Sequence, residues 1–205
     1  MRSINQLSEY LFKWGKIVEE NVVKAHQETA KKTYDAGGDS EAFNINAKET
    51  LLKYQALEKA TLAKNYKAKI DSLDFAKYNT EKYASGESNL NKVSSLFEQN
   101  ASATEIFAAS ESAYNDLYTV YKDGYTEICN AKKLAIADVK KQADELKANK
   151  GDKEGYSAAT SLYNAAETDF SKELYESAFK GYESTFVAFS GVYERVLEKR
   201  KKAEE

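Results

Sequence analysis

The sequence contains no proline, one cysteine and one histidine in 205 residues. Proline lacks a backbone amide proton and clashes with the preceding helical turn, so its absence is typical of long, uninterrupted helices. The single cysteine, Cys129, excludes an internal disulfide, and we expect it to be a buried thiol. The single histidine, His26, excludes a metal site built from several histidines. These absences favour a helical protein and argue against the commonest arrangements of catalytic residues.

An excess of positive charge and a long apolar run are also missing. Thirty basic and 33 acidic residues give a net charge of −3, which offers no field to attract phosphates, so we expect no nucleic-acid partner. The basic run EKRKKAEE at residues 198–205 alternates with acids, as a solvated helix end does. No apolar run approaches the roughly 18 residues that cross a bilayer, so we expect no membrane span in this chain.

Helical periodicity runs through the whole sequence. Apolar residues recur at steps of three and four, and no segment has a convincing period of two, so the expected fold class is all-α. The short connections predict three successive antiparallel hairpins, arranged as a helical array or an elongated bundle. We expect one domain over residues 1–205, part of a longer chain. Its hairpins cover about residues 3–70, 72–150 and 152–205, with helices over about 3–36, 41–70, 73–99, 102–146, 152–170 and 174–205.

Caps and glycines mark the expected helix ends. Ser102 and Glu105 have the spacing of a capping box, and a polar cluster at residues 71–74 predicts the start of the third helix. Gly86 lies inside a predicted helix, where it costs about 1 kcal/mol relative to alanine. A close approach of two helices, or a local bend, is the expected compensation.

The segment SLYNAAETDFSKELYESAFKGYEST at residues 161–185 resembles a tetratricopeptide repeat. In that two-helix unit a small residue lets the helices approach while an aromatic ring fills the gap beside it. The sequence departs from the repeat at Asp169, where an aromatic is usual, at Thr185, where alanine is usual, and in lacking the closing proline. A fainter echo relates residues 82–90 to 162–170. The positions that match the packing residues of the repeat are Leu162, Ala166, Tyr175, Ala178 and Tyr182.

The alanine- and tyrosine-rich helices, ending in VYERVLEKRKKAEE at residues 192–205, are similar to helical domains of spirochaetal periplasmic proteins or lipoproteins that precede a LysM module. That resemblance implies export to the periplasm or cell envelope, and envelope assembly with another protein as partner. It also implies a link to peptidoglycan through a domain outside this sequence. The composition alone leaves the cytoplasm open.

Tyrosine is abundant, with 15 residues, and four of them form a ladder on one predicted helix. Steps of four, three and four place Tyr114, Tyr118, Tyr121 and Tyr125 on one stripe, which would suit a groove for a peptide, a glycan or a partner helix. The alternative is that the stripe packs against a neighbouring helix with its hydroxyls toward solvent.

No pattern of acids, glycines or nucleophiles points to catalysis. Adjacent acids such as Glu19 and Glu20 face different sides of a helix, and the sequence has neither a Glu-x-x-His motif nor a glycine-rich phosphate loop. We therefore expect a non-enzymatic domain without cofactor or metal that binds another protein. The alternative is a helical carrier that encloses a small ligand or a glycan in an aromatic pocket.

Overall fold

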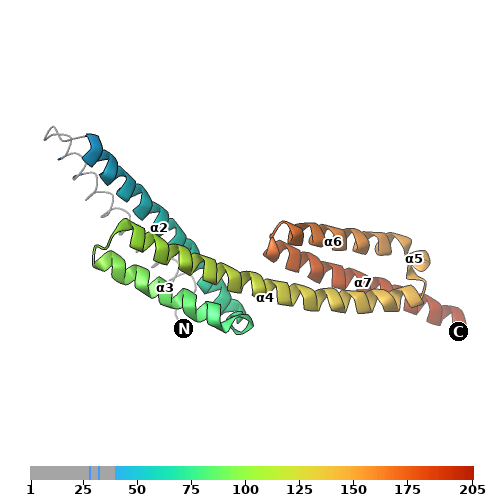
Figure 1. Cartoon of the computed structure of the whole chain (residues 1–205). Coiled ribbons are helices and arrows are strands. Elements are labelled where there is room, and N and C mark those ends of the chain that lie inside the picture. The colour runs from blue at the N-terminus through green and yellow to red at the C-terminus, as the bar shows by residue number, and fades with distance from the viewer. Residues whose placement is uncertain (1–27, 29–31, 33–39) are drawn as a thin grey trace. The chain divides into compact units, whose positions relative to one another are not determined.

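The computed structural model describes residues 28, 32 and 40–205 (Figure 1). Within these residues the chain is helical and contains no strand, so the all-α prediction is confirmed. The helix predicted over residues 3–36, including His26, lies almost wholly outside the described part. The described elements are α2 (Ser40–Leu73), the 3-10 turn η1 (Ala76–Tyr78), α3 (Thr80–Glu98), α4 (Ala103–Glu145), α5 (Ala148–Gly151), α6 (Lys153–Ser171) and α7 (Tyr175–Glu204).

Local signals position most helix ends correctly. The capping box at Ser102 forms, because the Glu105 amide donates to the Ser102 hydroxyl at 3.3 Å and the Glu105 carboxylate accepts from the Ser102 amide. Asp152 caps α6 by accepting a hydrogen bond from the Gly155 amide at 3.1 Å. The predicted starts of α4 and α6 are thereby confirmed.

The predicted start of the third helix near residue 73 is wrong. Leu73 is the exposed last residue of α2, and Asp74 takes a left-handed φ of 55° that ends the helix. Phe75 then turns inward, is almost fully buried, and donates its amide to the Ile70 carbonyl at 2.9 Å. Burial of Phe75 therefore outweighs the capping potential of the cluster at 71–74, and α3 begins only at Thr80.

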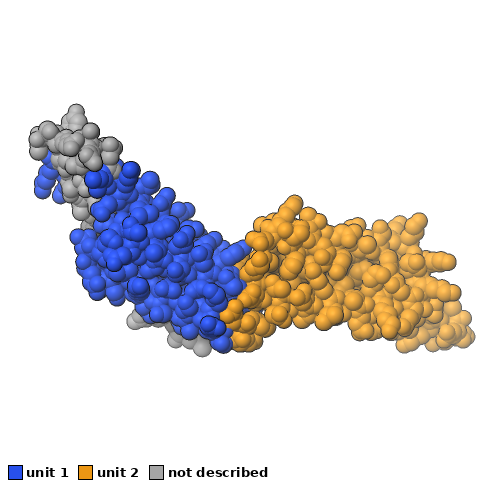
Figure 2. Space-filling model, in the orientation of Figure 1, with its two compact units in different colours: residues 1–76, 80–120 blue, residues 77–79, 121–205 orange. Residues whose placement is uncertain are grey.

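The chain divides into two compact units, coloured separately in Figure 2. Unit 1 contains residues 1–76 and 80–120, and unit 2 contains residues 77–79 and 121–205, so α4 contributes residues to both. The expected division into three hairpins stays a prediction, because most of the first half of the first hairpin lies outside the described residues.

Small residues bring helices close together inside each unit. A Cβ atom added at Gly86 of α3 would lie 2.5 Å from Leu117 of α4, and one added at Gly181 of α7 would lie 2.8 Å from the Cβ of Ala166 of α6. Both glycines therefore occupy close helix contacts, which compensates for their low helix propensity. One core cluster of unit 2 consists of Cys129, Ile136, Val139, Ala159, Ala166, Ala178, Tyr182 and Phe189.

Candidate functional site

Three tyrosine rings gather between α2 and α4 in unit 1, and we call Tyr66, Tyr114 and Tyr118 the tyrosine patch. The rings of Tyr114 and Tyr118 are nearly parallel, with centroids 6.0 Å apart, because a four-residue step places them on successive helical turns. Tyr66 of α2 lies 5.9 Å and 5.3 Å from these two rings. All three side chains are half-buried, so each ring combines packing contacts with exposed area.

A neighbouring lysine and burial affect the electrostatics of the tyrosine patch. The Lys59 ammonium lies 4.3 Å from the centroid of the Tyr114 ring, within the range of a cation–π interaction. Burial, together with the neighbouring Tyr114, raises the pKa of Tyr66 above its ordinary value. The Tyr66 phenol thus stays neutral near pH 7, and the half-buried rings of the patch offer aromatic area to a partner.

The other half of the ladder packs inside unit 2. Tyr121 and Tyr125 are each only 7% exposed, and their rings lie 6.3 Å and 6.4 Å from the Tyr175 ring of α7. The Tyr121 hydroxyl donates to Glu176 at 3.1 Å. Burial, with a smaller contribution from Glu176, raises the pKa of Tyr125 to about 12. For these two residues the structure shows the packing alternative, in which rings fill the interior, whereas Tyr114 and Tyr118 retain accessible surface.

The residues assigned to repeat packing occupy the α6–α7 hairpin. Ala166, Ala178 and Tyr182 are fully buried, and Tyr175 is 4% exposed. Leu162, by contrast, is 39% exposed on α6. The close-packing positions of the hairpin are thus filled by the small and aromatic residues named from the sequence, while Leu162 lies at its surface.

A buried tyrosine and an ion pair join the helices of unit 2. The Tyr182 hydroxyl donates to Glu167 at 2.8 Å, and the Lys133 ammonium of α4 lies 2.9 Å from the same carboxylate. Lys133 also lies 4.3 Å from the centroid of the Phe170 ring. Burial raises the pKa of Glu167, but hydrogen bonds from Lys133 and the two tyrosines Tyr182 and Tyr163 outweigh it and lower the pKa overall.

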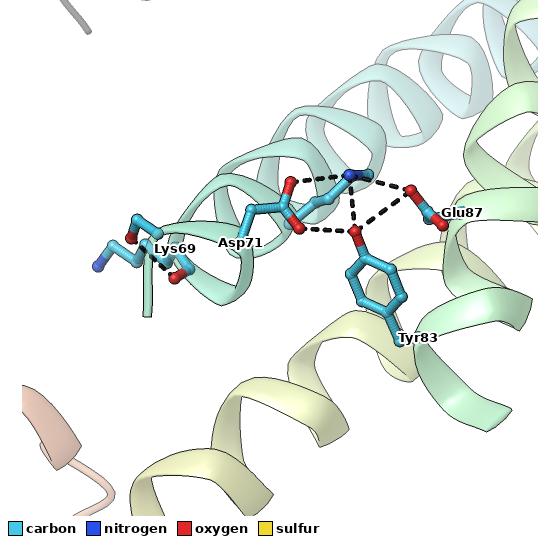
Figure 3. A network of polar contacts seen from close by, with 6 residues as sticks. Lys69, Asp71, Tyr83 and Glu87 are labelled. Atoms are coloured by element: carbon cyan, nitrogen blue, oxygen red, sulfur yellow. Dashed lines mark hydrogen bonds and ion pairs between the residues drawn. The ribbon is translucent and has the colours of Figure 1, made fainter. Parts of the chain in front are cut away.

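The fainter sequence echo corresponds to a similar polar arrangement in unit 1. The Tyr83 hydroxyl donates to Asp71 at 2.6 Å and lies 3.2 Å from Glu87, and Figure 3 shows this hydroxyl between the two carboxylates. The Lys67 ammonium of α2 lies 3.0 Å from Glu87. Burial lowers the pKa of Lys67, but its hydrogen bonds to Asp71, Tyr83 and Glu87 raise it overall.

In both units, therefore, a tyrosine and a glutamate lie four residues apart on one helix, and the glutamate pairs with a lysine of the preceding long helix. These residues are Tyr83, Glu87 and Lys67 in unit 1. In unit 2 they are Tyr163, Glu167 and Lys133. The tyrosine and glutamate are visible in the sequence echo, because local spacing places them together. The lysines, like Lys59 and Tyr66, were not recognised from the sequence, because they approach from helices 16 to 55 residues away.

Metal ligation, the thiol and membrane-spanning length can each be judged for the described residues. No group of three or more histidine, cysteine, aspartate or glutamate side chains there could hold a metal ion. Cys129 is a buried free thiol, as expected, and burial raises its pKa to about 11. Among the helices of the described part, none combines the length and apolar character needed to cross a membrane.

Comparison with known proteins gives one named relative. The chain is 27% identical over 154 residues to Treponemal membrane protein A of Treponema phagedenis. The match covers 74% of this chain and 44% of that protein, so the chain corresponds to less than half of the relative's length. No protein-family model matches, and no solved structure matches. The chain is thus an all-α protein similar to a spirochaetal membrane protein, which agrees with the spirochaetal resemblance but gives no support for the tetratricopeptide resemblance.

Proposed function

We propose that this chain is a non-enzymatic interaction domain of a cell-envelope protein and that it binds another envelope protein. The observation that carries the proposal is the tyrosine patch, in which three half-buried rings from two helices form one surface beside Lys59. Tyrosine is enriched at protein interfaces because a ring supplies large apolar area and its hydroxyl a hydrogen bond, at little cost in conformational entropy.

The geometry favours a partner that lies along the helices. Tyr114 and Tyr118 are stacked one turn apart, so their exposed edges follow the axis of α4, and Tyr66 broadens the surface toward α2. A partner helix or an extended peptide would contact successive rings in this arrangement. Lys59 would add attraction for an acidic side chain of the partner.

Localisation and repeat class belong to the same proposal. Similarity to a treponemal membrane protein supports a place in the periplasm or cell envelope, where a further domain would link the protein to peptidoglycan.

We assign the α6–α7 hairpin as a degenerate tetratricopeptide-like unit. The close contact between Gly181 and Ala166, flanked by the buried Tyr182, supports that assignment.

The test removes the rings while preserving the helices. A Tyr114→Ser, Tyr118→Ser variant is compared with a matched Tyr114→Phe, Tyr118→Phe variant that keeps both rings. Circular dichroism establishes that each is folded. We expect affinity capture from the envelope fraction, quantified by mass spectrometry, to recover a partner with the wild type and the Phe variant. Because aromatic anchors contribute about 2 kcal/mol or more, recovery should fall at least tenfold with the Ser variant.

Two results would contradict the proposal. Equal capture by the folded Ser variant would show that the patch does not bind the partner. If neither form captures a protein, and native mass spectrometry finds a co-purified small molecule, the carrier alternative takes its place.

A further inference from the structure

Five basic residues lie at the end of unit 2 where α4 connects to α6. Lys147, Lys150 and Lys153 lie exposed along this connection. From the last turns of α7, Lys199 donates to the Gly151 carbonyl at 3.0 Å and Arg200 donates to the Leu146 carbonyl at 2.8 Å. We call these five residues the basic tip.

The connection that carries the lysines is held in one conformation. Ala148 of α5 is fully buried and belongs to one core cluster with Val192 and Val196 of α7. A Cβ atom added at Gly151 would lie 3.2 Å from Val196, so the backbone of α5 approaches α7 closely. Because α5 is anchored through its small residues, Lys150 of α5 and the flanking Lys147 and Lys153 stay exposed at the surface.

Three of the five acids within residues 144–154 and 198–202 form ion pairs. Asp144 forms an ion pair with Lys140 at 2.8 Å, and Asp152 forms one with Arg195 at 2.7 Å. Glu198 forms one with Lys202 at 2.6 Å, which leaves Glu145 and Glu154 in these two segments beside the five cations of the tip. The tip therefore carries a local excess of positive charge in a chain whose net charge is −3.

We propose that the basic tip contacts the anionic headgroup surface of a lipid membrane. Lysine is depleted at protein–protein interfaces, which use aromatic and apolar anchors, and none of the large exposed hydrophobic side chains belongs to residues 145–154 or 198–202. Clustered basic side chains without an apolar anchor are the chemistry that anionic lipids attract. This inference is independent of the tyrosine patch.

The test measures sedimentation of the whole chain with vesicles of mixed phosphatidylglycerol and phosphatidylcholine, and with vesicles of phosphatidylcholine alone. The tip variant is Lys147→Asn, Lys150→Gln, Lys153→Gln. Asparagine is chosen because Lys147 has a left-handed φ of 55°, which asparagine tolerates. A matched control, Lys48→Gln, Lys92→Gln, Lys180→Gln, removes the same charge from three exposed lysines spread along the chain.

We expect binding to the anionic vesicles alone, weakened by salt. Each lysine near an anionic surface strengthens binding about fivefold, so the tip variant should bind about 100-fold more weakly and the control much less so. Absence of binding to anionic vesicles, or equal losses in the two folded variants, would overturn the inference. Tip-dependent binding to polyglutamate without binding to vesicles would overturn it in favour of an acidic protein.

Discussion

At the scale of single residues, burial determines what the polar groups of unit 2 can do. Burial raises the pKa of Cys129 to about 11 and that of Tyr125 to about 12, so both groups keep their protons near pH 7. The thiol lies in an aromatic and aliphatic core cluster, and the phenol ring packs against the Tyr121 and Tyr175 rings. In the described structure both act as packing groups.

The thiol of Cys129 should be almost inert in the folded protein. At pH 8 a pKa of about 11 leaves about one thiol in a thousand ionised, and full burial blocks the reagent as well. We expect Ellman's reagent to react at least 100-fold faster in guanidinium chloride than in buffer, measured at the same pH. A thiol-free Cys129→Ala variant gives the background rate, and similar rates in the two solvents would contradict the burial of Cys129.

At the scale of helices, small residues determine how closely neighbours pack. Gly181 faces the Cα and Cβ atoms of Ala166, which belong to the backbone of α6 or are fixed to it. Gly191 lies further along α7. A Cβ atom added there would lie 3.1 Å from a terminal nitrogen of the flexible Arg195 side chain. The two glycines therefore have different roles although both lie inside α7.

Substituting these two glycines should have opposite effects. Gly181→Ala forces α6 and α7 apart, which costs about 1–3 kcal/mol and exceeds the gain in helix propensity of about 1 kcal/mol. Gly191→Ala keeps that gain, because the Arg195 side chain can move aside. We expect urea unfolding followed by circular dichroism to show a lower free energy of unfolding for Gly181→Ala and an equal or higher one for Gly191→Ala. Equal destabilisation by both substitutions would disprove the close contact at Gly181.

At the scale of the whole molecule, the chain forms two compact units, and α4 contributes residues to both. Each unit has its own close contact, Gly86 with Leu117 in unit 1 and Gly181 with Ala166 in unit 2. Each also has its own lysine–glutamate pair, Lys67 with Glu87 and Lys133 with Glu167. Because these contacts do not share residues, the units have separate sources of stability.

A destabilising substitution in one unit should therefore lower the stability of that unit more than that of the other. We expect Gly181→Ala to reduce the hydrogen-exchange protection of α6 and α7 more than that of α2 and α3, because local unfolding follows local packing. Gly86→Ala should produce the reverse pattern and serves as the matched control. Hydrogen exchange read by mass spectrometry separates the two cases, and a uniform loss across all four helices would show one cooperative unit instead.

Local sequence was sufficient to predict the helical fold. Three- and four-residue periodicity predicts the long described helices but misses the four-residue α5 at Ala148–Gly151, and capping at Ser102 and Asp152 depends on residues within one turn. The start of α3 could not be placed in this way. It depends on the burial of Phe75, which is a property of the assembled unit and not of the neighbouring sequence.

The candidate surfaces, in contrast, depend on contacts between residues distant in the chain. Helical spacing placed four tyrosines on one stripe, yet packing against Tyr175 buries Tyr121 and Tyr125. The basic tip arises because Lys199 and Arg200 bind carbonyls about 50 residues earlier in the chain. Periodicity specifies which face of a helix a side chain occupies, whereas the packing of the other helices determines whether that face is buried or exposed.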